Sequence, residues 1–219
     1  MTITAIVQAR MGSRRFPGKV LAPFRGEPII VHVLREVGAI VGPHATIVAT
    51  SDQPSDDVLD AFLRERGVAV VRGDLENVLA RFQQAARTCA SEWILRVSAD
   101  SPLLDGSVLR QVIHAADDGQ CDLVTTIFPR TFPKGRNAEL IRRSALLAVD
   151  ADAVTPEERE HVTPFFYSRP DRYRIRNVGS GGAALAAESF AVDTPEDLAR
   201  LEGTSLLDRS RPPGMRPPE

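Results

Sequence analysis

The chain has 219 residues, of which 43% are hydrophobic, so it can bury one good core and a single domain is the default expectation. Its 27 basic and 29 acidic residues nearly balance, which argues against a nucleic-acid partner or a membrane surface, because both need a net basic face. No signal peptide is recognisable and no apolar run approaches the ~18 residues of a membrane span, so we expect a cytoplasmic protein.

Apolar strands and amphipathic helices alternate through the first 126 residues. Almost uninterrupted apolar runs predict strands, at residues 2–8, 45–50, 68–71, 92–97 and 122–126. Apolar positions at helical spacing predict helices, at residues 28–37, from about 55, at 77–90 and at about 106–117. This alternation predicts an α/β fold with a mostly parallel sheet and helices on both faces. The ligand site of such a sheet lies at the carboxyl ends of its strands.

The second half of the chain is less regular. The proline-rich run at 128–135 cannot be a central strand, because proline lacks the N–H that a sheet needs. The remaining patterns predict helices at about 144–149 and 156–166, and short strands at 173–177 and 190–192.

The domain organisation follows from these patterns. We expect one domain over residues 1–203, with an elaboration at about 128–190 that could include an arm used for dimerisation. The proline-rich tail at 204–219 has nothing to bury and is expected to be disordered.

A glycine- and cation-rich loop follows the first strand. It carries no acid and four cations: Arg10, Arg14, Arg15 and Lys19. Gly12 and Gly18 allow a close approach of the backbone to a ligand, and Pro17 stiffens the exit of the loop. A strand that leads into such a loop presents N–H groups and positive charge to phosphates, so we favour a phosphate site over a solvated basic loop. The spacing is neither that of a P-loop nor Gly-x-Gly-x-x-Gly.

Two aspartates follow apolar strands near the expected ligand site. Asp100 comes after the strand at 92–97, where a carboxylate can hold the magnesium of a bound triphosphate, and the alternative is that Asp100 or Ser101 caps the next helix. The segment 194–197, Thr-Pro-Glu-Asp, has the form of a helix start, which leaves Asp193 without a structural task. An ordinary turn aspartate would look the same.

The opening segment resembles the cytidylyltransferase family that includes the spore-coat polysaccharide, acylneuraminate and 3-deoxy-manno-octulosonate enzymes. It matches the family pattern Ile-x-Gln-Ala-Arg-x-Gly-Ser-x-Arg-x-Pro-x-Lys, and the spore-coat branch most closely. The resemblance covers roughly residues 3–200 and implies a nucleotide-diphospho-sugar transferase (Rossmann-like) architecture. It also implies that the loop binds the nucleoside triphosphate through a set of residues: Ala9, Arg10, Met11, Gly12, Ser13, Arg14 and Lys19.

The same resemblance implies two metal ligands. Residues 99–103 correspond to the family's Gly-Asp-x-Pro-Leu, whose aspartate binds metal, with Ala99 in place of the glycine. Residues 192–198 match the family's Val-Asp-Thr-Pro-Glu-Asp-Leu, whose first aspartate supplies a second ligand. The expected catalytic residues are therefore Arg10, Lys19, Asp100 and Asp193, with the two aspartates holding Mg²⁺.

A third segment that resembles a family motif covers residues 72–82. The family's Arg-Gly-x-x-x-Asp-Val-Leu-x-Arg-Tyr/Phe lies beside the cytosine pocket, and Asn77 stands here where the aspartate is usual. By this resemblance Arg72 contacts base or ribose, with Arg81 as a second candidate. The alternative is that the segment forms a core-facing helix with Arg81 in solvent.

Two motifs point to the acceptor. Residues 132–139 resemble the family's Pro-x-Gly-x-Asp-x-Glu, with Asn137 for the aspartate, and residues 158–164 match its Arg-Glu-His-Val-Thr-Pro. The candidate substrate residues are Gln8, Arg136, Glu139, Arg159 and His161. The two arginines could hold a carboxylate or a phosphate, because guanidinium matches both oxyanions. For His161, a catalytic role and a structural hydrogen bond are equal alternatives.

The resemblance implies transfer of CMP from CTP to an anionic acceptor, with release of pyrophosphate. The acceptor classes left open are a sugar acid, a sugar phosphate, a polyol phosphate and a phosphonate, and the family habit suggests a homodimer. Three alternatives remain: a nucleotidyltransferase that uses another triphosphate, a GT-A-like glycosyltransferase and a non-catalytic nucleotide-binding protein. The glycosyltransferase is the weaker of these, because Asp100-Ser101-Pro102 lacks the usual Asp-x-Asp.

Overall fold

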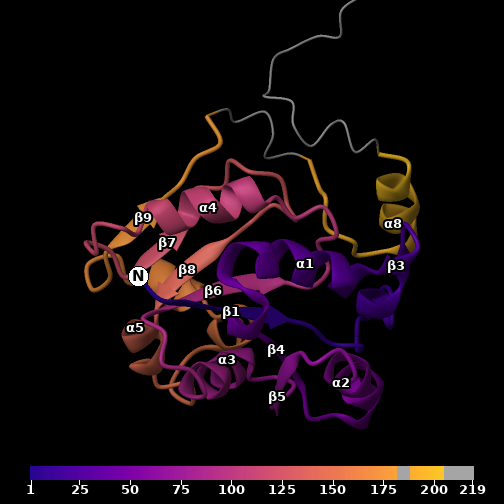
Figure 1. Ribbon diagram of the computed structural model, residues 1–219. Helices are drawn as coiled ribbons and strands as arrows, with labels where there is room; N and C mark the ends of the chain where they lie inside the picture. Colours follow the sequence, from indigo (N-terminus) through magenta and orange to yellow (C-terminus); the bar gives the residue numbers. More distant parts are fainter. Residues whose placement is uncertain (182–187, 205–219) are drawn as a thin grey trace, which may run out of the picture.

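A seven-stranded sheet forms the centre of the molecule in the computed structural model, which describes residues 1–181 and 188–204. Its strands run in the order β5-β4-β1-β6-β8-β7-β9 (Figure 1). Their bounds are Ile3–Gln8 (β1), Thr46–Ser51 (β4), Ala69–Gly73 (β5), Trp93–Ser98 (β6), Leu123–Thr125 (β7), Glu139–Arg142 (β8) and Ile175–Asn177 (β9). A separate ribbon pairs β2 (Pro23–Phe24) with β3 (Glu27–Pro28).

The pairing confirms the mostly parallel sheet that the sequence predicts. Strands β5, β4, β1 and β6 pair in parallel, as do β7 and β9. Strand β8 is antiparallel to both of its neighbours, β6 and β7. Sequence patterning did not predict β8, because it is short and follows the irregular segment at 128–138. Leu140 and Ile141 are nevertheless fully buried, since β8 lies between two other strands.

Helices cover both faces of the sheet, as predicted. Figure 1 shows α1 and α4 on one face, with α3 and α5 on the other. The helices are α1 (Ile29–Val41), α2 (Asp57–Arg64), α3 (Val78–Arg87), α4 (Gly106–His114), α5 (Arg143–Leu147), α6 (Pro156–His161), α7 (Pro164–Tyr167) and α8 (Pro195–Glu202). In the part of the chain that is described, single 3₁₀ turns lie at Lys19–Leu21, Pro43–Ala45 and Pro54–Asp56.

Two hydrophobic clusters hold these layers together. Val33 of α1 and Leu109 of α4 belong to the cluster on one face of the sheet, and Phe82 of α3 and Leu146 of α5 belong to the cluster on the other. The alternating strand side chains divide between the two, so burial on both faces explains why the strands are almost uninterruptedly apolar. Trp93 is among the largest of these buried side chains.

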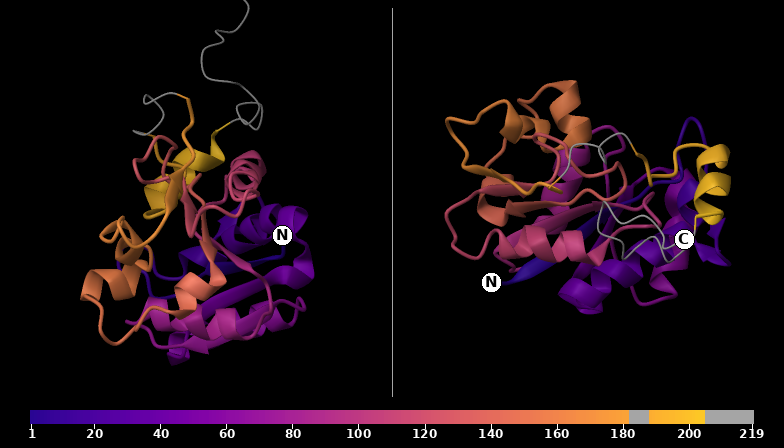
Figure 2. Two further views of the ribbon diagram at one scale, coloured as in Figure 1. Left: turned by 90° about the vertical axis from the view of Figure 1, so that its left-hand side faces the viewer. Right: turned by 90° about the horizontal axis from the view of Figure 1, so that it is seen from above.

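Besides β8, the second half departs from the prediction at two further places. The helix expected at 156–166 is divided into α6 and α7, because Val162 has a φ of 67° and Pro164 starts a new helix. The strand expected at 190–192 is not formed: an isolated bridge between Ser189 and Lys134 takes its place. In Figure 2 the segments coloured orange, which include α6 and α7, gather on one side of the molecule.

The predicted helix start at 194–197 is present as a capping box. Thr194 accepts a hydrogen bond from the N–H of Asp197, and the Asp197 carboxylate accepts one from the N–H of Thr194. Asp105, rather than Asp100 or Ser101, is the N-cap of α4. Asp100 and Asp193 are thus both left without a capping task.

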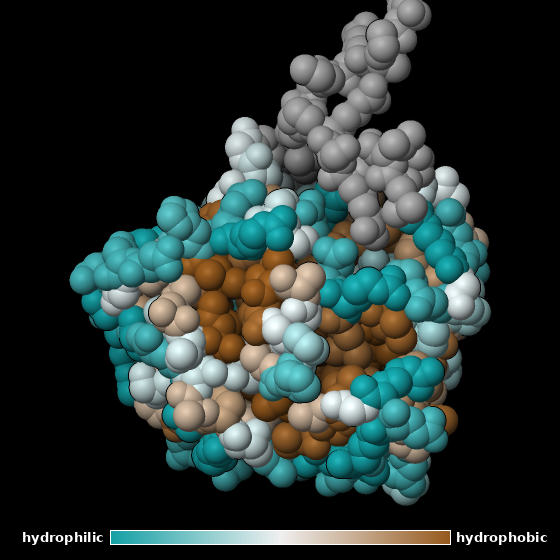
Figure 3. Space-filling view, viewed as in Figure 1, coloured by the Kyte–Doolittle hydropathy of each residue, from teal (hydrophilic) through white to brown (hydrophobic). Residues whose placement is uncertain are grey.

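No helix among the described residues is long and apolar enough to cross a membrane. On the face seen in Figure 3, hydrophilic residues surround apolar side chains that come to the surface between them. Of the expected tail at 204–219, only Thr204 lies within the described residues, so the domain boundary stays a prediction.

Candidate active site

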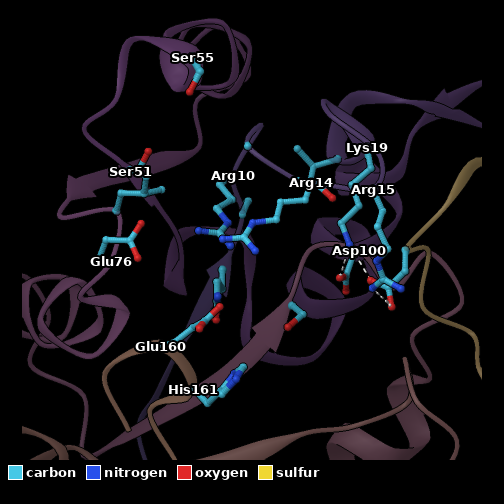
Figure 4. Close-up of a pocket in the computed structure, with 18 residues that line it drawn as sticks. Arg10, Arg14, Arg15, Lys19, Ser51, Ser55, Glu76, Asp100, Glu160 and His161 are labelled. Atoms are coloured by element: carbon cyan, nitrogen blue, oxygen red, sulfur yellow. Dashed lines mark hydrogen bonds and ion pairs between the residues drawn. The ribbon is translucent and has the colours of Figure 1, made fainter. Parts of the chain in front are cut away.

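A cavity of about 670 Å³ opens at the carboxyl ends of β1, β4 and β6, the edge where the sequence places a ligand (Figure 4). Many of the predicted site residues line it: Gln8, Ala9, Arg10, Gly12, Ser13, Arg14, Lys19, Asp100, His161 and Asp193. Other lining residues were not among the sequence candidates for the site: Arg15, Val20, Ser51, Ser55, Leu75, Glu76, Ser98 and Glu160.

The loop after β1 folds back on itself through the carbonyl of Met11. That oxygen accepts hydrogen bonds from the N–H of Ser13 (2.9 Å) and of Gly18 (2.8 Å). Gly18 has a φ of 74°, a conformation that side chains with a Cβ rarely adopt, and the 3₁₀ turn at Lys19 starts directly after it. This turn directs Lys19 back toward the sheet.

A buried carboxylate anchors this loop to the end of β4. Asp56 is fully buried, and its Oδ1 accepts a hydrogen bond from the N–H of Met11 (2.6 Å). Its Oδ2 accepts hydrogen bonds from the Thr50 hydroxyl (3.0 Å), the Ser51 N–H (3.0 Å) and the Ser51 hydroxyl. Met11 therefore contributes through its backbone, and it does not line the cavity.

Arg10 and Arg14 have no hydrogen-bond or ion-pair partner within residues 1–181 and 188–204. Both line the cavity, and their guanidinium groups point toward the same part of it (Figure 4). The two arginines are thus free to bind an anion with several oxygens.

Two carboxylates far apart in the sequence converge on one ammonium group. The Nζ of Lys19 lies 2.8 Å from Oδ2 of Asp100 and 3.1 Å from Oδ1 of Asp193, and it also donates to the carbonyl of Val192 (2.8 Å). The N–H of Val192 in turn donates to the carbonyl of Asp100 (2.8 Å), which ties the two segments together. The two carboxylates thus lie together as expected, but only Asp100 follows a strand, since the strand expected at 190–192 is not formed.

Asp193 is the most heavily paired carboxylate of the cavity. Besides Lys19, it contacts Arg15 (3.0 Å) and Lys134. Burial by itself raises the pKa of the Asp193 carboxyl, but the hydrogen bonds and charges of Lys134 and Lys19 outweigh it and lower that pKa to about 2. Asp193 therefore stays ionised at any physiological pH.

The donor set at this point fits a magnesium ion. Asp100 and Asp193 lie close together, because both accept from the Nζ of Lys19, and their carboxylates supply the hard oxygens that Mg²⁺ prefers. Mg²⁺ is commonly held by one or two carboxylates together with substrate phosphates and water, rather than by a full protein cage. In keeping with this, the part of the chain that is described contains no group of three or more histidine, cysteine or acidic side chains suited to a metal.

A buried network lies next to Gln8. Its side-chain oxygen accepts a hydrogen bond from Arg96 (3.2 Å), and Arg96 is ion-paired with Glu139. Glu139 is buried and also accepts from the Tyr167 hydroxyl, whose pKa is raised by burial and by the charge of Glu139. Glu139 therefore does not reach the cavity, and it acts on the site only through Arg96 and Gln8.

Three arginines that were predicted to bind substrate or nucleotide contact other parts of the protein instead. Arg72 donates to the carbonyls of Ser51 (3.0 Å) and Gln53 (2.9 Å) and pairs with an exposed carboxylate of α2. Arg136 lies over the ring of Phe190, 4.4 Å from its centroid. Arg159 donates to a backbone carbonyl of the preceding turn. None of the three lines the cavity, so the structure does not bring them to the predicted positions.

Arg81 is fully buried, contrary to the alternative that it lies in solvent. It donates to the carbonyls of Asp74 and Leu75, and so supports the segment whose Leu75 and Glu76 line the cavity. Its Nε and second terminal nitrogen have no partner among the described residues. Burial, followed by the charge of Arg10, lowers the pKa of the Arg81 guanidinium.

His161 ends helix α6 and lines the cavity beside Glu160. A capping box of Thr155 and Glu158 starts that helix, so the sequence defines where it begins. The imidazole has no hydrogen-bond partner in the described ranges. The structural hydrogen bond that was one of the two alternatives for His161 is therefore not seen there. His161 is therefore available to a ligand.

Comparison with known proteins agrees with this geometry. The family described as Cytidylyltransferase matches residues 4–207. The chain is 31% identical to the spore coat polysaccharide biosynthesis protein SpsF of Bacillus subtilis, over 96% of this chain and 89% of that protein. It is 33% identical to a 3-deoxy-manno-octulosonate cytidylyltransferase of Anaeromyxobacter dehalogenans, over 95% and 84%.

A solved structure supports the same assignment. A cytidylyltransferase from Leptospira borgpetersenii superposes with a TM-score of 0.86 at 27% identity, covering 95% of this chain and 92% of that one. The match extends through both halves of the sheet, including the irregular second half. The chain therefore belongs to the cytidylyltransferase family of nucleotidyltransferases.

Proposed function

We propose that the protein transfers CMP from CTP to an anionic acceptor and releases pyrophosphate. One observation carries this proposal: two arginines without partners among the described residues and two carboxylates line the same cavity. Arg10 and Arg14 can bind phosphate oxygens, while Asp100 and Asp193 converge on Lys19 a short distance away. Catalysis of phosphoryl transfer consists mainly of such positioning and charge neutralisation.

The layout of the cavity supports a direction for the nucleotide. In Figure 4, Ser51, Ser55 and Glu76 lie at one side of the cavity, and Lys19 and Asp100 lie at the other. We place the nucleoside against the first group, which offers hydroxyl and carboxylate partners for base and ribose. The triphosphate then passes Arg10 and Arg14, so these residues bind the β- and γ-phosphates and the pyrophosphate that leaves.

Asp100 and Asp193 are the residues that would hold Mg²⁺. The bound ion would polarise the α-phosphate and lower the pKa of the acceptor's attacking group. Lys19 keeps the two carboxylates together and adds positive charge beside them. The attacking oxygen of the acceptor displaces pyrophosphate from the α-phosphorus, its proton passes to solvent, and a CMP conjugate forms.

Pyrophosphate release from a panel of nucleotides tests this proposal. CTP, UTP, GTP and ATP would each be combined with Mg²⁺ and one of five acceptors: two sugar acids (3-deoxy-manno-octulosonate and a nonulosonate), a hexose 1-phosphate, glycerol 3-phosphate and a phosphonate. We expect release with CTP and one acceptor class, and a product whose mass includes CMP. Release with another nucleotide and not with CTP would overturn the choice of CTP. Transfer of a sugar from a nucleotide sugar would favour a glycosyltransferase instead.

A further inference from the structure

The chain uses lysine at only two positions. Its lysines and arginines number 27 together, and the lysines are Lys19 and Lys134 alone. Both contact the carboxylate of Asp193, although they lie far apart in the sequence. A chain that uses arginine at nearly all its cationic positions thus has its two compact, point-like cations at one carboxylate.

The two lysines meet Asp193 in different ways. The Lys19 side chain is 12% exposed and its ammonium has three partners, two carboxylates and a backbone carbonyl. The Lys134 side chain is 53% exposed, and its ammonium has one partner in residues 1–181 and 188–204, Oδ2 of Asp193. An ammonium has three N–H donors, so Lys134 keeps two for another ligand.

The backbone holds Lys134 at this place. Its N–H donates to the carbonyl of Glu188 (3.1 Å), and its carbonyl accepts from the N–H of Phe190 (2.6 Å). Gly135 permits this close approach: its φ is +89°, and a Cβ there would lie 2.5 Å from the backbone carbon of Phe190 and from the nitrogen of Ala191. Main-chain contacts therefore fix the backbone of Lys134 beside Asp193.

Neither of the arginines expected to bind the acceptor lines the cavity. Arg136 lies over an aromatic ring, and Arg159 donates to a backbone carbonyl. An anionic acceptor that attacks beside Asp100 and Asp193 approaches two carboxylates, whose charge is offset by Lys19, Arg15 and Lys134. The Lys134 side chain is half exposed and keeps N–H donors free, so it can attract and bind the anion of the acceptor.

We propose that Lys134 binds the anionic group of the acceptor and holds its attacking oxygen beside Asp193. The inference rests on the proposed function, since it concerns the acceptor of that same site. An ammonium binds a carboxylate and a phosphate alike through charge and short N–H···O contacts. The shared chemistry is thus an oxyanion on the acceptor, and the experiment distinguishes the two kinds.

Steady-state kinetics of three variants test the proposal. Lys134→Met removes the charge and keeps the length of the side chain, and Lys134→Arg keeps the charge. Arg35→Met is the matched control, because Arg35 is an exposed cation paired with the carboxylate of Glu27 outside the cavity. We expect Lys134→Met to raise the acceptor KM about ten- to a hundredfold and to leave the CTP KM within about twofold of wild type. Lys134→Arg recovers most of the loss, and Arg35→Met has no effect.

Two kinetic results would overturn the assignment. An unchanged acceptor KM in Lys134→Met, with only a shift of thermal stability, would make Lys134 a structural counter-ion of Asp193. An equal rise of the CTP KM would place Lys134 on the triphosphate instead. The acceptor that turns over, 3-deoxy-manno-octulosonate or glycerol 3-phosphate, identifies the oxyanion as a carboxylate or a phosphate.

Calorimetry separates a failure of this inference from a failure of the proposed function. If the wild-type protein releases no pyrophosphate with any acceptor, the proposed function fails. Titration of wild type and Lys134→Met with 3-deoxy-manno-octulosonate and with glycerol 3-phosphate, in the presence of CMP, still tests Lys134. Weaker binding of one of the two to Lys134→Met supports the inference. Equal affinity, or binding of neither compound to wild type, overturns it.

Discussion

The loop at residues 9–19 and the segment at 128–177 are both rich in cations, but they use them differently. In the loop, Arg10 and Arg14 have no partner within the described ranges and face the cavity. In the later segment every arginine contacts a carboxylate, an amide or backbone carbonyl, or an aromatic ring, and these are Arg130, Arg136, Arg142, Arg143, Arg159, Arg169, Arg172, Arg174 and Arg176.

This difference follows from the secondary structure of the two regions. The loop is anchored by its backbone, through the contact of Met11 with Asp56, and by the side chain of Lys19, so Arg10 and Arg14 are not needed to hold it in place. The later segment has short strands and helices, and its arginines supply the contacts that longer elements would provide. A cluster of cations in the sequence therefore predicts a ligand site only where other contacts, such as backbone hydrogen bonds, already hold the segment in place.

The first and largest effect should come from the carboxylates of the cavity. Asp100→Asn keeps the size of the side chain and removes the charge that would hold Mg²⁺, so we expect turnover to fall by at least about a hundredfold. Pyrophosphate release measured against Mg²⁺ concentration checks this. Asp105→Asn is the matched control: asparagine caps a helix as well as aspartate does, so activity should be retained. Wild-type turnover in Asp100→Asn would remove Asp100 from the mechanism.

The contrast between the two regions predicts opposite effects for two arginines. Arg10→Met should raise the CTP KM about ten- to a hundredfold and leave the thermal midpoint nearly unchanged, because Arg10 has no partner in the described part of the protein. Arg136→Met should leave the CTP KM unchanged and reduce stability by about 1 kcal/mol, since it loses the contact with Phe190. KM measurements and thermal unfolding of both variants decide this. The reverse pattern would contradict the comparison.

The anchor of the loop can be loosened without changing a cavity residue. Asp56→Asn replaces one of two acceptor oxygens by an NH₂ group that faces N–H or O–H donors, so we expect a loss of about 2–3 kcal/mol of stability. The CTP KM should rise several-fold as the loop loses its position. Asp57→Asn is the control, because its side chain is 64% exposed and its pair with Arg72 contributes about 0–1 kcal/mol. Equal effects in denaturant unfolding would show that Asp56 is no anchor.

The smallest expected effect concerns the pH dependence of the later segment. The hydrogen bond from Arg169 lowers the pKa of the Glu158 carboxyl, and this outweighs burial, which raises it. A lowered pKa in the folded state gives stability that is present above the ordinary pKa of about 4.3 and is lost as the pH falls below it. Glu158→Gln should therefore lose less stability than wild type between pH 6 and pH 3. Parallel thermal midpoints over this range would contradict the prediction.

The contacts of Lys134 refine the comparison of the two regions. In the segment around residues 128–138, it is the cation that reaches a cavity carboxylate, and it keeps N–H donors free. Under our two proposals, a lysine binds the acceptor and two arginines bind the nucleotide.

The sequence by itself determined the fold class, the cation loop and the capping box at 194–197. Each of these follows from a local pattern. Apolar periodicity predicts the fold class, glycines and cations within ten positions predict the loop, and a threonine followed by proline and acid predicts the capping box. Local patterns suffice because the interactions they encode are formed between near neighbours in the chain.

Only the tertiary structure decided which polar residues reach the cavity. Asp56 stands among Asp52 and Asp57 in the sequence, and nothing local distinguishes it, but it alone of the three is buried under the loop. Strand β8 and the contact of Lys134 with Asp193 likewise depend on segments that are distant in the sequence. The reason is physical. Burial and ion pairing depend on which distant residues the folded sheet brings into contact, and local sequence patterns contain no information on these contacts.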